Sequence, residues 1–247
     1  MNPTSDTVTV FYHMPKSGGT SLGGILRRNY PPEAIVECGP DTHAFVAEMA
    51  TWPPERLAAI RLLQGHFPFG LHTMLPRPAR CFTLLRDPVE RVISYYYHAR
   101  RDPGHYLHRL IHDNDWSLEA LLESRLALMM NDGQVRLLSA VWGEAPFDGV
   151  DEGLLATAAE NLRACEVVGV TEQFDLTLLL LQRAFGWRDI AYTRDNVGQN
   201  RLPAAALSPA TLAAVRRHNL RDLALYELSR DMLARQARAA GPLLRLR

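Results

Sequence analysis

Residues 8–21 read V-T-V-F-Y-H-M-P-K-S-G-G-T-S, and this stretch decides the fold. The run VTVFYH at residues 8–13 is mostly apolar and predicts a short buried strand. Residues 15–19 predict a loop, and residues 20–28 predict a helix with Thr20 or Ser21 as its N-cap. Such a strand, loop and helix can hold phosphate, because the helix N-terminus offers unpaired N–H groups and the positive end of its dipole.

The loop contains the only lysine of the chain, Lys16, although the sequence has 27 Lys and Arg residues in total. Lysine carries a compact point charge, whereas the guanidinium of arginine is planar and bidentate. We therefore interpret the lysine at position 16 as a sign that the loop requires an ammonium group. The loop is not a Walker A motif, because no glycine lies upstream of the lysine. A tight strand–helix turn would explain the glycines but not the lysine and hydroxyls beside them.

A second motif follows a second apolar run, RCFTLL at residues 80–85, which predicts a buried strand. Asp87 and Pro88 are typical of the N-cap and first position of a helix, here expected to run to about Arg101 with an Asp87–Arg91 ion pair. Capping does not explain Arg86. This residue stands at the carboxyl end of the strand, where open α/β sheets bind their ligands.

The remaining chain continues the alternation of strands and helices. Further strands are predicted at residues 35–38, 61–64 and 166–170, and helices at 54–60, 151–163, 173–185 and 208–237, with 104–140 mostly helical. This order predicts an α/β fold with a central parallel sheet flanked by helices. No internal repeat or linker divides the chain, so residues 1–247 are expected to form a single domain.

Composition narrows the class of protein. The formal net charge is zero, which gives no indication of nucleic-acid binding or of a polybasic membrane anchor. Cys38, Cys81 and Cys165 form no C-x-x-C pair, and no long apolar segment or signal peptide is evident. We therefore expect a soluble cytoplasmic protein without a membrane span; the sequence does not indicate its oligomeric state.

The run F-Y-H-M-P-K-S-G-G-T-S-L at residues 11–22 closely resembles the phosphosulfate loop of Golgi-type carbohydrate sulfotransferases and their bacterial relatives. The resemblance implies a P-loop-like sulfotransferase fold that binds 3′-phosphoadenosine 5′-phosphosulfate (PAPS). It further implies that Lys16 lies by the bridging oxygen of PAPS. The loop residues carried over as nucleotide-binding are Lys16, Ser17, Gly18, Gly19, Thr20 and Ser21.

The run L-R-D-P-V-E-R-V-I-S-Y-Y-Y at residues 85–97 resembles the 3′-phosphate motif of the same family. Carried over, Arg86 and Ser94 hold the 3′-phosphate, and an arginine fork suits a terminal phosphate. Residues 131–138 and 169–174 look like later family segments. Residues 196–201 fall where relatives close a loop over the nucleotide, which makes Arg201 a further candidate.

Gly65-His66 ends the strand between the two motifs and resembles the uronyl and heparan sulfate 2-O-sulfotransferase branch, whose histidine is the general base. His66 is the candidate base, because an imidazole suits the deprotonation of an alcohol near neutral pH. The alternatives are a merely structural hydrogen-bonded His66 and a competing base, His13, which we expect instead to support the loop. The acceptor is predicted to be a glycan or small glycoside.

The resulting hypothesis is a metal-independent O-sulfotransferase. His66 takes the acceptor proton, and Lys16 stabilises the leaving adenosine 3′,5′-bisphosphate (PAP). The rivals are a phosphoryl transferase and a non-catalytic nucleotide-binding protein of the same fold. His105, His108 and His112 fall on one predicted helix face, which suits a solvated face, a wall of the acceptor site or, least of all, a metal site.

Overall fold

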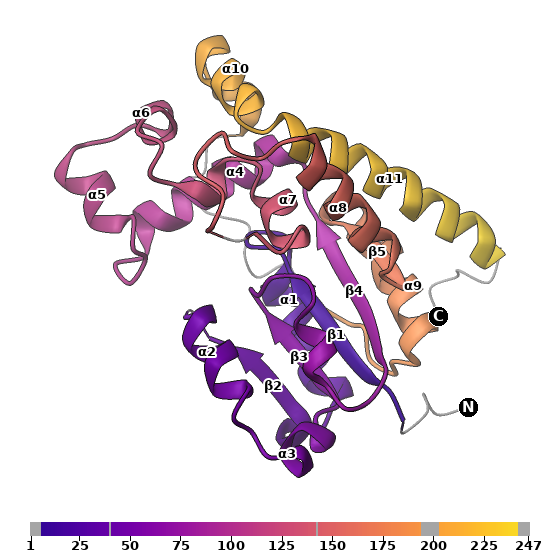
Figure 1. The fold of residues 1–247 in the computed structure, drawn as a ribbon. Coiled ribbons are helices and arrows are strands. Elements are labelled where there is room, and N and C mark those ends of the chain that lie inside the picture. The colour runs from indigo at the N-terminus through magenta and orange to yellow at the C-terminus, as the bar shows by residue number, and fades with distance from the viewer. Residues whose placement is uncertain (1–5, 40, 142, 194–202, 242–247) are drawn as a thin grey trace.

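In a computed structural model of the chain, which describes residues 6–39, 41–141, 143–193 and 203–241, five parallel strands form one sheet in the order β2-β3-β1-β4-β5 (Figure 1). The strands are β1 (Val8–His13), β2 (Ile35–Cys38), β3 (Leu62–Gly65), β4 (Ala79–Leu85) and β5 (Val167–Val170). Helices flank the sheet, so the predicted α/β fold with a central parallel sheet is confirmed.

The described helices connect and cover the strands. They are α1 (Gly19–Asn29), α2 (Thr42–Met49), α3 (Pro54–Ala59), α4 (Pro88–Arg101), α5 (His108–Asp113), α6 (Leu118–Glu123), α7 (Gly133–Leu138), α8 (Glu152–Arg163), α9 (Phe174–Phe185), α10 (Pro209–Arg217) and α11 (Leu220–Ala240). The long helix α11 packs along β5 and α8, where Figure 1 shows it in yellow.

The two central strands bring the two sequence motifs together. β1 and β4 are hydrogen-bonded neighbours, with His13 in register with Leu84. The chain leaves β1 toward β2 on one side of the sheet and leaves β4 toward β5 on the other. This divergence creates a topological switch point at the carboxyl ends of β1 and β4, the usual position of a ligand site in such sheets.

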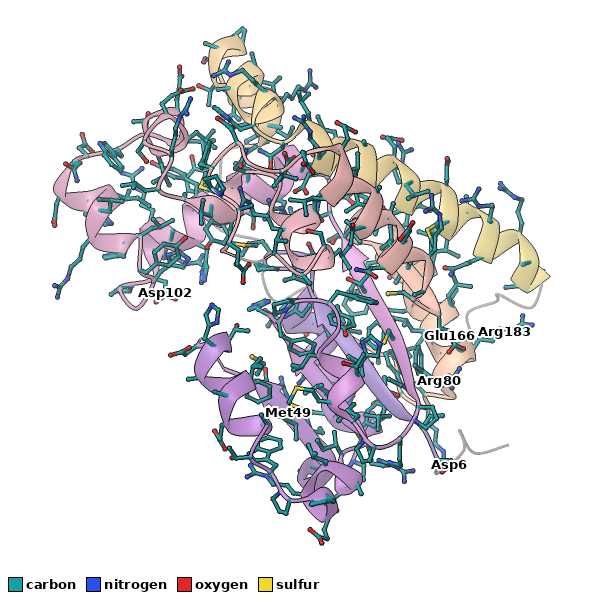
Figure 2. All side chains as sticks on the ribbon, in the orientation of Figure 1. Asp6, Met49, Arg80, Asp102, Glu166 and Arg183 are labelled. Atoms are coloured by element: carbon teal, nitrogen blue, oxygen red, sulfur yellow. The ribbon has the colours of Figure 1, made fainter. Side chains whose placement is uncertain are left out.

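Two buried hydrophobic clusters support this arrangement. The larger one surrounds the sheet and includes Met49 of α2, labelled in Figure 2. The smaller one lies beneath α4, α5 and α6 and is closed by Val215 of α10. Figure 1 shows α5 and α6 projecting to one side of the sheet at the far end of α4. We refer to residues 88–124 as the α4–α6 lobe.

Several element boundaries differ from the sequence-based prediction. The helix expected over residues 208–237 is two helices, because buried Asn219 interrupts it and bonds the carbonyls of Met130 and Val215. Residues 104–140 form short helices separated by turns, with left-handed backbone at Asp115 and Arg125. Helix α2 was not predicted; Asp41 caps it by accepting from the Ala44 N–H.

No helix in the described ranges is both long and apolar enough to cross a membrane.

Candidate active site

The loop between β1 and α1 has an unusual backbone. Lys16 has a left-handed conformation with φ 68°, and Gly18 follows with φ 78°. Gly18 is the N-cap of α1, so the prediction that Thr20 or Ser21 caps the helix was wrong. Both hydroxyls lie instead in the first turn, beside the free N–H groups. A strained non-glycine backbone of this kind persists where surrounding contacts hold it, often at functional sites.

Gly18 and Gly19 are needed because side chains pack directly against them. A Cβ at residue 19 would lie 1.7 Å from His13 Nε2, and one at residue 18 would lie 3.2 Å from the Phe174 ring. The first separation is impossible, so the imidazole of His13 occupies the place of a side chain at position 19. Phe174 begins α9, and the segment 169–174 singled out in the sequence therefore borders the loop.

Arg86 joins the second motif to the first. It follows β4, and its Nη1 donates to the Lys16 carbonyl at 3.0 Å. Its backbone is fixed by a two-bond clamp from the amide of Gln134: the Arg86 N–H donates to Oε1 at 2.9 Å, and Nε2 donates to the Arg86 carbonyl at 3.0 Å. Gln134 is fully buried in α7. The guanidinium is thereby held against the phosphate loop.

A buried ion pair holds Gln134 in turn. The Asp222 carboxylate accepts the backbone N–H groups of Gln134 and Val135 at 3.0 and 2.8 Å, at the start of α7. Arg91 donates to the same carboxylate at 3.3 Å, and both side chains are fully buried. The predicted Asp87–Arg91 pair is therefore wrong, because Asp87 caps α4 through the Glu90 N–H at 2.9 Å and Arg91 turns inward.

Two polar atoms beside the loop are buried without a hydrogen-bond partner among the described residues. They are Ser17 Oγ and Arg86 Nε, both of which can donate. A buried donor without an acceptor costs free energy, so such atoms are rare unless a ligand satisfies them. With Lys16 and the N-terminus of α1, these donors fit an anion such as phosphate.

Ser94 lies on the α4 face that continues from Arg86. Glu90 Oε2 is 3.6 Å from Arg86 Nη2, and Ser94 is one helical turn further on. Ser94 is half-buried. Arg201 lies outside the described residues. The loop residues and Arg86 therefore meet beyond the ends of β1 and β4, and Ser94 lies about two turns further along α4. Their roles stay predictions.

His66 is held by its backbone and by one ring nitrogen. Gly65 has φ 144°, and a Cβ there would lie 2.6 Å from Cys38 Cβ, so glycine is required before the histidine. Thr42 Oγ1 donates to the His66 carbonyl at 2.7 Å. His66 Nδ1 lies 2.7 Å from the His13 carbonyl. Because a carbonyl only accepts, Nδ1 carries the hydrogen, and neutral His66 has its lone pair on Nε2.

Electrostatics keep this histidine pair neutral. The His13 and His66 rings lie 4.3 Å apart between centroids. Burial lowers the pKa of His66, the Lys16 ammonium lowers it further, and the His13 carbonyl opposes them. Burial holds the pKa of His13 well below its usual range, with further lowering by His66 and Lys16. An uncharged His66 with a free Nε2 can accept a proton from an alcohol.

The three histidines predicted to share one helix face do not do so. Asp102-Pro103-Gly104 form a turn, so His105 precedes α5, whereas His108 and His112 lie within it with their rings 4.5 Å apart and tilted by 49°. His108 Nδ1 and His112 Nε2 reach the Ala99 and Arg100 carbonyls at the end of α4. In the described part of the chain, no three His, Cys, Asp or Glu side chains gather as one metal ion would require.

A cavity of about 180 Å³ lies between α1 and the sheet, next to His13. Its polar lining comes from Arg27, Glu37, Gln64 and Thr20. The usual range for ligand pockets begins near 300 Å³, so this cavity is too small for a nucleotide. It extends the site on the β2 side of the loop.

The fold and site define an α/β protein with buried donors in a glycine-rich loop and a neutral histidine beside it. No family model matches the chain. It is 26% identical over 276 residues to heparan-sulfate 6-O-sulfotransferase 2 of Gallus gallus, covering 94% of this chain and 68% of that protein. It is 27% identical over 282 residues to heparan-sulfate 6-O-sulfotransferase 3-B of Danio rerio, covering 94% and 65%.

These similarities support the predicted resemblance to carbohydrate sulfotransferases; the 2-O branch stays a prediction, since both of these relatives are 6-O enzymes. The chain spans about two thirds of their length. A solved structure of mouse sulfotransferase SULT7A1 complexed with PAP aligns with 89% of this chain and 65% of that one, at 16% identity and a TM-score of 0.40. That likeness is too weak to define the fold, which rests on the sheet topology.

Sequence reasoning missed the residues that position Arg86. Gln134 is 48 residues away in the sequence from its partner Arg86. Asp222 is 88 residues away from its partner Gln134. Segment 131–138 was singled out only as a family-like segment. The available signal was a Gln beside Val135, Leu137 and Leu138, because an amide that is buried with such neighbours must be hydrogen-bonded.

The contact between His13 and Gly19 predicts a steric effect that a second substitution relieves. Gly19→Ala places a methyl group on the imidazole and should destabilise the protein by about 1–3 kcal/mol in denaturant unfolding. The matched control is Gly24→Ala in the same helix, whose Cβ would meet only Arg28 Nη1 at 3.7 Å. Adding His13→Ala to Gly19→Ala should recover part of the loss. Equal stability of the two single alanine variants would contradict this packing.

Proposed function

We propose that this protein is a PAPS-dependent O-sulfotransferase that transfers a sulfuryl group to a hydroxyl of a carbohydrate. The observation that carries the proposal is the junction of the two motifs, in which Arg86 Nη1 bonds the Lys16 carbonyl while Arg86 Nε and Ser17 Oγ remain available as buried donors. Such a junction suits a nucleotide that carries phosphate at both its 5′ and its 3′ position.

The donor half follows from charge and geometry. The N-terminus of α1 and the loop N–H groups would bind the 5′-phosphate, and Arg86 with Ser94 would bind the 3′-phosphate. Lys16 stands next to these groups as the only ammonium side chain of the sequence. Its charge would neutralise the oxygen that leaves sulfur, which is where negative charge grows in the transition state.

The second part of the proposal concerns the acceptor and the group that takes its hydroxyl proton. The acceptor oxygen attacks sulfur in line with the bridging oxygen, the new O–S bond forms, and the bond to the bridging oxygen breaks. His66 Nε2 takes the hydroxyl proton, since Nδ1 already donates to the His13 carbonyl. PAP leaves with the bonding electron pair. Lys16 compensates the negative charge that grows on the leaving oxygen, and His66 accepts the proton of the attacking hydroxyl. The scheme therefore requires no metal ion.

The acceptor is proposed to be a glycan or small glycoside, which the similarity to heparan-sulfate sulfotransferases supports. The proposal covers either a 2-O or a 6-O position of the sugar. A cytoplasmic location is also proposed. Cys38, Cys81 and Cys165 are buried free thiols, and burial raises the pKa of Cys81 to about 12, which suits core residues in a reducing compartment.

Recognition of the 3′-phosphate can be tested by calorimetric titration with PAP, AMP and ATP without metal ions, and with ATP again in the presence of Mg²⁺. PAP should bind roughly 10- to 100-fold more tightly, because charge-assisted hydrogen bonds contribute about 1.5–3 kcal/mol. Arg86→Gln should abolish most of this difference, whereas Arg230→Gln on the exposed face of α11 should not. Equal affinities in the wild-type protein, or ATP binding only with Mg²⁺, would favour the phosphoryl transferase instead.

The general base can be tested by the pH dependence of kcat/KM. His66 must be unprotonated to act, and burial lowers its pKa, so the loss of activity on acidification should occur below pH 6.5, the unperturbed histidine value. In the His66→Gln variant, kcat/KM should no longer fall at acidic pH in this way, and its value should be about 10²- to 10⁴-fold lower than in the wild-type protein. His112→Gln is the control histidine. An acid limb that persists unchanged in His66→Gln would assign the proton to another group.

A further inference from the structure

A cluster of polar side chains continues the nucleotide-facing side of α4 beyond Ser94. His98 follows Ser94 by one turn, about 6 Å further along the helix axis. Its Nε2 lies 3.8 Å from Asp102 Oδ2, and its ring lies 5.5 Å from the ring of His105, edge to face. We call His98, Asp102 and His105 the His98 cluster.

The His98 cluster continues the row of side chains that runs from Arg86 through Glu90 and Ser94 along α4. Burial is the main cause of the lowered pKa of both His98 and His105, and the Lys16 ammonium adds to it at both rings. Figure 2 shows Asp102 on the side of the α4–α6 lobe that is turned toward α2 and the sheet.

The cluster has hydrogen-bonding capacity that the fold does not use. His108 and His112 bond carbonyls of α4, but the imidazole of His98 forms no hydrogen bond within the described ranges, and its 3.8 Å separation from Asp102 is too long for one. His105 Nδ1 accepts from the Leu107 N–H at 3.2 Å, so its Nε2 carries the hydrogen and can donate. Tyr95 packs edge-on against the His105 ring and fixes its position.

The chemistry of the cluster selects its ligand. Burial lowers the pKa of His98 and brings that of His105 to about 4, so both rings are neutral near pH 7. The Asp102 carboxylate would repel a sulfate or carboxylate group. Neutral imidazoles and a carboxylate together offer both donors and acceptors, which suits vicinal hydroxyls, each of which donates and accepts.

We propose that His98, Asp102 and His105 bind the hydroxyl groups of an uncharged sugar ring of the acceptor and hold it opposite His66. The proposal rests on the proposed function and adds the acceptor's binding wall to it. One face of α4 would then bind the 3′-phosphate of the nucleotide through Ser94 and the acceptor through His98, one helical turn apart.

The direct test follows the imidazole NMR signals of His98 and His105 in the full chain, first with PAP and then with desulfated heparan sulfate oligosaccharide or a neutral glucoside added to the PAP complex. The signals are assigned by His98→Gln and His105→Gln. The proposal predicts small shifts with PAP and larger, saturable shifts with a saccharide. Shifts that saturate with PAP alone, or no response to either saccharide in a protein that binds PAP, would overturn it. Failure to bind PAP would instead overturn the proposed function.

Kinetics provide the second measurement. His98→Ala should raise the acceptor KM about tenfold, the loss of one hydrogen bond, while the PAP affinity stays at the wild-type value. His98→Gln should recover part of the loss, because an amide also donates and accepts. His112→Gln, which can still bond the Arg100 carbonyl, is the matched control. A parallel loss of PAP affinity in His98→Ala would assign His98 to the nucleotide and contradict the proposal.

Discussion

The site depends on one hydrogen bond, from Arg86 Nη1 to the carbonyl of Lys16 at 3.0 Å. It connects the loop after β1 to the residue after β4, and therefore fixes the distance between the two sequence motifs proposed to bind phosphate. Lys16 presents its carbonyl through a left-handed backbone, and Arg86 is held by the clamp of Gln134. Behind that clamp stands the buried Arg91–Asp222 pair. Removing one partner of such a pair leaves an uncompensated buried charge, so losing either residue would destabilise this support.

Around this junction, close packing sets the protonation of the site. His13 lies against the bare Cα of Gly19 and packs against the ring of His66. The same packing buries both rings, which lowers the pKa of each, and leaves the His13 carbonyl to fix the tautomer of His66. Gly19 thus makes room for the histidine whose carbonyl orients His66, the proposed base.

Local sequence patterns predicted the strands, the parallel sheet and both motifs, because apolar runs and glycine-rich turns depend on nearby residues. The predictions failed where distant residues decide the structure. Arg91 was assigned to Asp87, four residues away, but pairs with Asp222 across the fold. Asn219 breaks a helix by bonding Met130, and Gln134 reaches Arg86. His105 left its expected helix because the turn at Asp102 redirects the chain. Such contacts leave no periodic signal.

The most direct test of the account is a transfer assay with PAPS and a desulfated heparan sulfate acceptor in the presence of a metal chelator. PAP release and sulfate-ester formation are followed together. The account predicts that both appear in equal amounts, require the acceptor, and persist with the chelator. Tight PAP binding without any transfer to a panel of hydroxyl acceptors would contradict it and indicate a nucleotide-binding protein without catalysis. Phosphoryl transfer from ATP that requires Mg²⁺ would contradict it as well.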